Sequence, residues 1–182
     1  MAKVAVILAP GFEEIEALTP VDVLRRATID CQMIGLVDRS VTGSHGITVE
    51  ADKVFTGDLS EYDMIVLPGG MPGSTNLRDH DVLISQLQAA VAAEKFVAAI
   101  CAAPIVLDRA GLLENRSYTC FPGQEETIQS GKHQTDLVVV DGPIVTSRGA
   151  GTSLAFAYQL VDLLGGNGQE QADRMVYTDL FK

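Results

Sequence analysis

One cysteine stands at a junction where a thiol could act as a nucleophile. The run Phe96–Ile100 is continuous and apolar, which is typical of a buried strand, and Pro104 suits the first turn of a helix. A residue between a strand and a helix, such as Cys101, occupies the place of a nucleophile elbow, although the letters G-x-S-x-G are absent. Free N–H groups at a helix start favour a thiolate, so we expect Cys101 to be reactive. The local sequence fits a small core side chain about as well.

A pair of glycines follows another apolar run. Met64–Leu67 reads as a core strand, and Gly69 and Gly70 come after Pro68. Glycine lets backbone N–H groups approach a ligand, and ligands of open α/β sheets bind beyond the carboxyl ends of the strands. The pair could supply an oxyanion hole, although taken alone such a pair is more often a tight turn without a ligand.

Three acidic residues follow the first predicted strand. Glu13, Glu14 and Glu16 come shortly after Val4–Leu8. Acids in the first turn of a helix are stabilised by the helix dipole, by ~0.3–1 kcal/mol each, and need no further reason. Because the first strand also ends at the carboxyl edge of the sheet, one of the three could face Cys101. Spacing alone does not say which.

Short apolar runs alternate with helical patterns along the chain. Most runs are continuous, which is typical of strands buried on both faces of a parallel sheet, and we expect their intervals to be too long for hairpins. Strand, helix and strand in repeated order predict βαβ units. We predict strands at Val4–Leu8, Met33–Val37, Met64–Leu67, Phe96–Ile100, Leu137–Val140 and Ile144–Thr146, and helices over 13–27, 81–94 and 152–164.

Three segments depart from this rhythm. Pro20 falls inside the first predicted helix, and Thr19 could cap a restarted helix, so we expect a kink there. Residues 40–60 hold several glycines around Ile47–Glu50, which indicates a small antiparallel excursion. Residues 115–135 are polar, and we expect a loop with a short helix.

Composition limits the classes of function. The chain has 182 residues, 47% of them hydrophobic, and a formal net charge of −11. This size predicts one domain, residues 1–182. Nucleic acid and anionic lipid bind through clustered Lys and Arg, so we expect neither as a partner. The first apolar stretch, Val4–Ala9, is too short for a signal sequence or a membrane span. We expect a cytoplasmic protein.

The cysteines support that compartment. Cys31, Cys101 and Cys120 are widely spaced, odd in number and without a CxxC motif. The pattern therefore predicts neither a disulfide framework nor a thiolate zinc site. Cys31 adjoins an apolar run and is expected in the core. Whether Cys120 could approach Cys101 and act as a resolving thiol stays open.

No cofactor or metal is expected either. His45, His80 and His133 are scattered without paired spacing, and we interpret them as solvated loop residues. Gly149–Gly151 starts a G-x-G-x-x-G pattern, but Leu154 occupies the third glycine position. We therefore interpret this segment as a strand–helix turn rather than a dinucleotide site.

Five segments together carry a family resemblance. They are Val6–Glu16, Pro20–Ala27, Val66–Gly70, Ala98–Pro104 and Thr146–Ser153. In content and order they resemble the ThiJ/PfpI superfamily, and most closely its branch of DJ-1-like and YajL-like proteins. The resemblance spans nearly the whole chain. It implies a flavodoxin-like three-layer α/β/α sandwich with a mainly parallel sheet, and a homodimer.

The resemblance also implies a catalytic site. It places Cys101 as the nucleophile on a strained elbow and selects Glu16 as the carboxyl that faces it. In that arrangement Glu16 is protonated and donates a hydrogen bond to the sulfur, which burial beside an anion favours. The backbone N–H groups of Gly70 and Ala102 match the oxyanion hole of the superfamily.

Two further arginines and two departures complete the comparison. Arg26 and Arg148 match positions near the pocket or the dimer contact. In the protease-like PfpI branch a histidine follows the cysteine, and here that residue is Ala102, which argues against peptidase activity. In animal DJ-1 relatives a histidine stands where this chain has Phe121, as YajL-like members do. The implied site is therefore Cys–Glu without histidine.

Two functions fit these residues. In the first, the Cys101 thiolate attacks an aldehyde, or the adducts that glyoxals form with protein thiols and amines, while Glu16 moves protons. The protein would then be a glyoxalase or protein deglycase acting on methylglyoxal or glyoxal adducts, including glycated protein side chains, in the response to oxidative and carbonyl stress. The alternative is a non-enzymatic redox sensor or chaperone in which Cys101 is oxidised to sulfinate.

Overall fold

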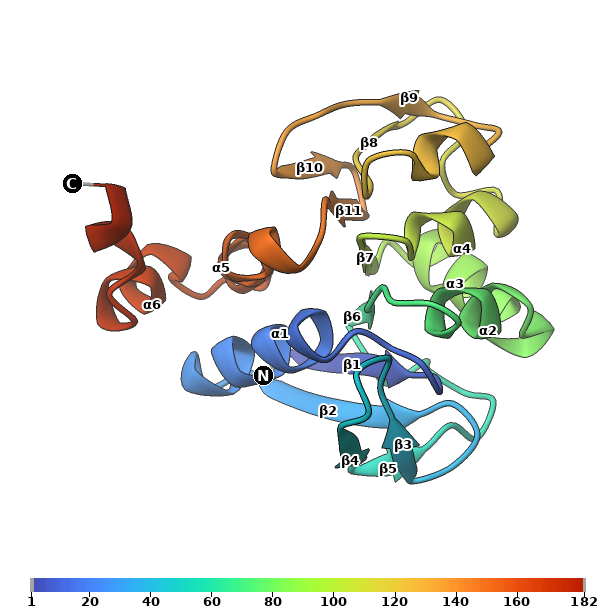
Figure 1. The fold of residues 1–182 in the computed structure, drawn as a ribbon, viewed down its shortest axis with the longest axis horizontal. Helices are drawn as coiled ribbons and strands as arrows, with labels where there is room; N and C mark the ends of the chain where they lie inside the picture. Colours follow the sequence, from blue (N-terminus) through green and yellow to red (C-terminus); the bar gives the residue numbers. More distant parts are fainter. Residues whose placement is uncertain (1, 182) are drawn as a thin grey trace.

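The computed structural model describes residues 2–181, which fold around a central sheet (Figure 1). Its strands run in the order β10-β11-β7-β6-β1-β2-β5, and all neighbouring pairs are parallel except β10 and β11. The strands are β1 (Lys3–Leu8), β2 (Asp30–Gly35), β5 (Lys53–Val54), β6 (Met64–Leu67), β7 (Phe96–Ile100), β10 (Val138–Asp141) and β11 (Ile144–Ser147).

Helices cover both faces of this sheet, as Figure 1 shows. On one face lie α2 (Gly73–Arg78), α3 (Asp81–Ala92) and α4 (Pro104–Arg109). On the other lie α1 (Glu14–Arg26), α5 (Ser153–Leu163) and α6 (Gly168–Arg174). The predicted flavodoxin-like three-layer α/β/α sandwich with a mainly parallel sheet is confirmed.

Burial on both faces explains why the strand sequences are continuously apolar. In β1, Ala5 and Ile7 pack into the core cluster beneath α2, α3 and α4, while Val4, Val6 and Leu8 pack into the cluster beneath α1, α5 and α6. Successive side chains of a strand point to opposite faces, so both sets must be apolar. Each buried aliphatic side chain contributes roughly 1.5–3 kcal/mol to folding.

The last two strands contradict the expectation that no runs are close enough for a hairpin. β10 pairs with β11 in antiparallel register, and only Gly142 and Pro143 separate them. Gly142 has a φ of +58°, which glycine adopts at little cost in a tight turn. β10 lies at the edge of the sheet and pairs with β11 alone. A short hairpin therefore suffices to connect the two strands, without the long crossover that a parallel pair needs.

The expected restart of the first helix at Thr19 is wrong. Helix α1 runs unbroken from Glu14 to Arg26, and Pro20 lies buried inside it. Its cap is Glu13, whose side chain accepts a hydrogen bond from the backbone N–H of Glu16. Packing of α1 against β1 and α5 therefore outweighs the one helical hydrogen bond that a proline removes.

Both irregular segments behave largely as predicted. β3 (Ser40–Thr42) and β4 (Thr48–Glu50) form the expected antiparallel pair. The 115–135 segment contains the expected short helix, the 3-10 helix η1 (Gln124–Thr127), and also a small parallel sheet that was not predicted. The remaining elements, most of which lack strong sequence signals, are β8 (Ser117–Tyr118), β9 (Lys132–His133), η2 (Ala150–Thr152) and η3 (Tyr177–Phe181). Within residues 2–181, none of the helices has the length and apolar character needed to cross a bilayer.

Candidate active site

Cys101 lies on a strained turn directly after β7. Its φ is +65°, a left-handed conformation that costs an L-residue roughly 1–2 kcal/mol. Two hydrogen bonds hold this backbone in place: Cys101 N–H donates to the carbonyl of Ser147 at 3.0 Å, and Phe121 N–H donates to the carbonyl of Cys101 at 2.9 Å. The side chain is half-buried. Strain maintained in this way is characteristic of functional turns.

The carboxyl group of Glu16 faces the sulfur of Cys101. Its Oε2 accepts a hydrogen bond from Gly69 N–H at 2.9 Å, whereas its Oε1 is buried and has no hydrogen-bond partner among the described residues. Glu16 is only 1% exposed. The two side chains interact directly, and the backbone N–H groups of Gly70 and Ala102 act on the sulfur. The structure therefore brings together the four residues that the resemblance selected.

Burial shifts the proton affinity of both reactive groups. It raises the pKa of Glu16 to about 7, against the opposing effect of its contact with Cys101. Burial also raises the pKa of Cys101 to about 12, and the charge of Glu16 adds to this increase. The N–H groups of Ala102 and Gly70 lower the pKa of the thiol by a smaller amount. The two groups thus compete for protons as a coupled pair.

The helix start favours a thiolate at Cys101 less than burial and Glu16 oppose it. Helix α4 begins only at Pro104, three residues further on, and has just 6 residues. Its dipole is therefore weak and displaced from the sulfur, while burial and the carboxylate of Glu16 both stabilise the thiol.

The two glycines after β6 have separate tasks. A side chain at Gly69 would lie 2.6 Å from Cβ of Cys101 and would overlap Oε2 of Glu16, so this position must lack a Cβ. Gly70 has a φ of +86°, and a Cβ there would overlap the backbone of Gly11 and Glu13. Its N–H interacts with the sulfur of Cys101. The turn therefore has a geometric role beyond chain reversal, and the need for a missing Cβ at Gly69 is a reason for the glycine pair that the sequence did not show.

The other two glutamates support the site without facing the sulfur. Oε2 of Glu13 accepts the N–H of Glu16 at 2.8 Å, which fixes the first turn of α1. Glu14 is buried and accepts hydrogen bonds from His45 N–H at 2.8 Å and from Ile47 N–H at 3.4 Å. It thereby holds the β3–β4 hairpin against α1. The sequence signal was the acidic cluster itself, but helix-dipole stabilisation explained it equally well.

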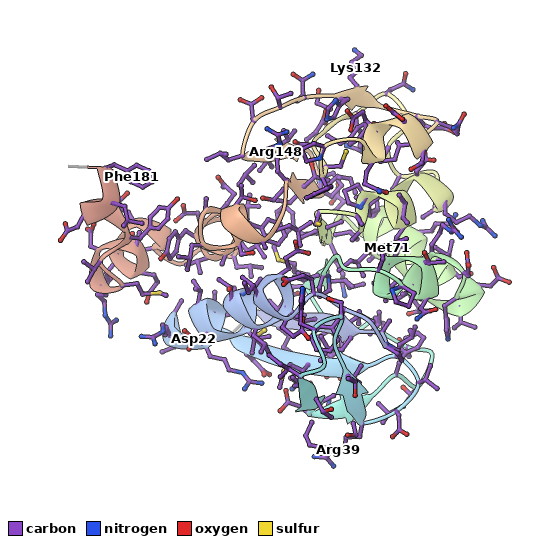
Figure 2. All side chains as sticks on the ribbon, viewed as in Figure 1. Asp22, Arg39, Met71, Lys132, Arg148 and Phe181 are labelled. Carbon is purple, nitrogen blue, oxygen red and sulfur yellow. The ribbon has the colours of Figure 1, made fainter. Side chains whose placement is uncertain are left out.

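The two arginines lie in different places. Arg26 is ten residues, or about 15 Å, along α1 from Glu16, and pairs with exposed Asp22 at 2.8 Å. Figure 2 shows Asp22 far from Arg148. Arg26 therefore lies away from Glu16 within one chain, and its role at the pocket or the dimer contact stays a prediction. Arg148 comes directly after Ser147, whose carbonyl accepts the N–H of Cys101. The guanidinium group of Arg148 donates a hydrogen bond to the carbonyl of Thr135 at 3.4 Å.

Two of the three histidines are not the solvated loop residues that we expected. His80 caps α3 and accepts the N–H of Leu83 at 3.2 Å. His133 ends β9 and is half-buried against the ring of Tyr118. Only His45 is exposed in a loop, as expected. Short polar segments gave no signal for these roles.

The remaining cysteines are distinct from Cys101. Cys31 is 4% exposed and packs in the core, as predicted. Cys120 is fully buried in the opposite core cluster, and its Sγ lies 3.9 Å from Oε2 of Glu125. This orientation gives no support to Cys120 as a resolving thiol for Cys101.

A mainly parallel α/β sandwich with a cysteine on a strained elbow, opposed by a buried carboxyl group, defines the class of this protein. The chain belongs to the DJ-1/PfpI family, whose family model matches residues 2–163. The predicted resemblance is therefore confirmed.

Individual relatives agree with this assignment. The chain is 35% identical to protein dj-1beta of Drosophila melanogaster over 181 residues, which is 94% of each chain. It is 34% identical to a deglycase of Pyrococcus abyssi, covering 89% of this chain and 99% of that protein. Among solved structures, a DJ-1 superfamily protein from Salmonella typhimurium superposes with a TM-score of 0.91 at 36% identity, covering 96% of this chain and 98% of the other.

Proposed function

We propose that this protein is a cysteine-dependent enzyme of the glyoxalase or deglycase type, acting on methylglyoxal or on glyoxal adducts of proteins in the response to oxidative and carbonyl stress. The observation that carries the proposal is the position of the sulfur of Cys101, on a strained turn between the carboxyl of Glu16 and the N–H groups of Gly70 and Ala102. The name of one relative, a deglycase, supports it.

In the proposed reaction the carboxylate of Glu16 takes the thiol proton as the Sγ–C bond forms on the aldehyde carbon. The carbonyl oxygen gains negative charge near the N–H groups of Gly70 and Ala102 and takes the proton back from Glu16, which gives a hemithioacetal and restores the carboxylate. Glu16 next removes the proton from the sulfur-bearing carbon, which gives an enediolate, and returns it to the adjacent carbon. The hydroxyl proton passes to the former ketone oxygen, which leaves a thioester. Water hydrolyses the thioester to lactate and regenerates the Cys101 thiol.

The test is consumption of methylglyoxal with lactate as the measured product. We expect turnover by the wild type and its loss in both Cys101→Ala and Glu16→Gln, because each variant removes one partner of the proton transfer. Cys31→Ser, which changes a core thiol away from the elbow, is the matched control and should retain turnover. A wild-type rate no higher than that of the two variants would refute the enzyme proposal.

The second candidate is a redox sensor or chaperone without turnover. It is favoured by the exposure of Cys101, which is the least buried of the three free cysteines. Peroxide would convert its sulfur first to sulfenic and then to sulfinic acid, whose oxygens the Gly70 and Ala102 N–H groups could bind. Oxidation alone does not separate the candidates, whereas lactate production does.

Two accompanying proposals concern context. We propose a cytoplasmic location, which the three free thiols support. We also propose a homodimer, in which exposed Arg26 could contribute to the contact. Light scattering after size exclusion measures the mass directly. A monomeric mass would refute the dimer.

A further inference from the structure

Three metal-ligating side chains gather outside the Cys101 site. Cys120, Glu125 and His133 each present a ligand atom, and these atoms lie within 4.8 Å of one another. The residues come from separate segments: Cys120 follows β8, Glu125 lies in η1 and His133 ends β9. In Figure 1 the strands β8 and β9 lie at the top of the view, beyond α4. Only the tertiary structure brings the three side chains together.

A buried nitrogen in this group has no partner. Nε2 of His133 is inaccessible to solvent and makes no hydrogen bond with the described residues. Leaving a buried polar atom unsatisfied costs about 1–3 kcal/mol, and native proteins rarely leave one without a reason. Cys120 belongs to the same group and is fully buried. An additional ligand would account for the unsatisfied nitrogen.

We propose that Cys120, Glu125 and His133 bind a zinc ion, with water in the fourth position. Thiolate, imidazole and carboxylate are the three ligand types of zinc, whose bond lengths of about 2.0–2.3 Å place tetrahedral ligand atoms about 3.5 Å apart. Sγ of Cys120 and Oε2 of Glu125 are already 3.9 Å apart. On binding, the Cys120 thiol releases its proton to solvent and the Zn–S bond forms, without any change of oxidation state.

The backbone around the three ligands is already ordered for binding. His133 is the register partner of Tyr118 in the β8–β9 sheet, two residues before Cys120. Gly123 has a φ of +91°, and its N–H donates to Oε2 of Glu125 at 2.7 Å, so the chain folds back toward the sulfur. Side-chain movements of about 1 Å would complete the coordination.

Charge and donor type favour zinc over magnesium or calcium. The Cys120 thiolate and the Glu125 carboxylate together neutralise a divalent ion, while the nearby positive charge of Arg148 opposes cation binding. Hard cations that rely on oxygen ligands gain nothing from sulfur and would find a single carboxylate here. The presence of sulfur and nitrogen ligands therefore determines the class of metal.

A second group provides an internal control. Glu13, Glu14 and His45 also lie within ligand distance of one another, but the carboxylate of Glu14 is already hydrogen-bonded to His45 and to the backbone. This group contains no sulfur. We therefore propose no metal site there, and His45→Gln serves as the matched histidine variant.

The test uses the full chain stripped of metal and titrated with Zn²⁺ against a chromophoric chelator, with Co²⁺ as a spectroscopic probe. We expect one equivalent of Zn²⁺ and a cobalt–thiolate charge-transfer band. Cys120→Ser should abolish the band. Glu125→Gln and His133→Gln each remove a direct ligand and should weaken Zn²⁺ binding by more than the ~10- to 100-fold that loss of an outer-shell partner causes. Circular dichroism checks that each variant is folded, and half-exposed Glu125 is the safest position for this comparison.

The controls separate this site from the elbow. His45→Gln and Cys101→Ala should each retain one equivalent and the charge-transfer band. Absence of binding by the wild type, unchanged binding in folded Cys120→Ser, or loss of binding in Cys101→Ala would each overturn the proposal. Failure of the glyoxalase assay leaves these outcomes unaffected, because none of the three proposed ligands takes part in that reaction.

Discussion

The backbone N–H of Gly69 donates a hydrogen bond of 2.9 Å to Oε2 of Glu16, across 53 residues of sequence. This bond fixes one carboxyl oxygen, while the other, Oε1, is buried and has no hydrogen-bond partner among the described residues. The carboxyl group as a whole interacts with the thiol of Cys101. The carboxyl group that faces the thiol is therefore positioned by a backbone contact from the turn after β6.

The first prediction concerns space at Gly69. A methyl group there would lie 2.6 Å from Cβ of Cys101 and 2.9 Å from the carbonyl of Ile100, as well as overlapping Glu16. We expect Gly69→Ala to destabilise the fold by about 1–3 kcal/mol and to slow alkylation of Cys101. Urea denaturation and iodoacetamide kinetics measure both effects. Gly151→Ala is the control, because nothing lies within 4 Å of its added Cβ; equal stability of the two variants would contradict this account.

The second prediction concerns the pH dependence of stability at Glu16. Burial raises its pKa from 4.5 to about 7, so the folded state holds a proton that the unfolded state has released. This contribution is complete below pH 4.5 and falls by about 3 kcal/mol as the pH rises to 7. The wild type should lose stability relative to Glu16→Gln over this window. A difference between the two that is independent of pH would rule out the raised pKa.

Glu14 should show the opposite sign. Burial alone would raise its pKa, but hydrogen bonds from His45 and Ile47 outweigh burial and hold the pKa below 4.5. The charged carboxylate therefore stabilises the folded state above pH 4.5, and this contribution is lost as the pH falls. We expect Glu14→Gln to be destabilised near pH 7 and to approach the wild type in acid. Denaturation curves at several pH values measure this. As the pH rises, the wild type should gain stability relative to Glu14→Gln and lose stability relative to Glu16→Gln.

Arg26 should have little effect on the reactive cysteine. It lies at the far end of α1 from Glu16, and its ion pair with Asp22 is exposed. Exposed pairs of this kind contribute about 0.3–0.5 kcal/mol. We expect Arg26→Ala to change stability by no more than this and to leave the alkylation rate of Cys101 unchanged. Slower alkylation of Cys101 in monomeric Arg26→Ala than in the monomeric wild type would show that Arg26 acts on the Cys101 site of its own chain.

Much of the fold followed from the sequence because burial leaves a direct record in composition. Strands β1, β6 and β7 are covered on both faces, so their residues are continuously apolar and their limits were predicted within one residue. The hairpin of β10 and β11 was missed because every pair of successive strands was expected to be parallel and joined by a long crossover. The position of β10 at the edge of the sheet, next to β11, is decided only by the tertiary structure. Helix α1 persisted through Pro20 because its packing, rather than its local propensity, stabilises it.

The sequence by itself determined the family and the place of Cys101 between a strand and a helix, since both depend on short segments of the chain that can be recognised one by one. It did not determine which of three glutamates faces the sulfur by spacing alone, nor that burial raises the pKa of that sulfur to about 12. It also gave no sign that Cys120, Glu125 and His133 meet. Such contacts join segments whose relative positions depend on strand register and layer packing. The desolvation that raises the pKa of Cys101, and the short distances between these side chains, therefore exist only in the folded chain.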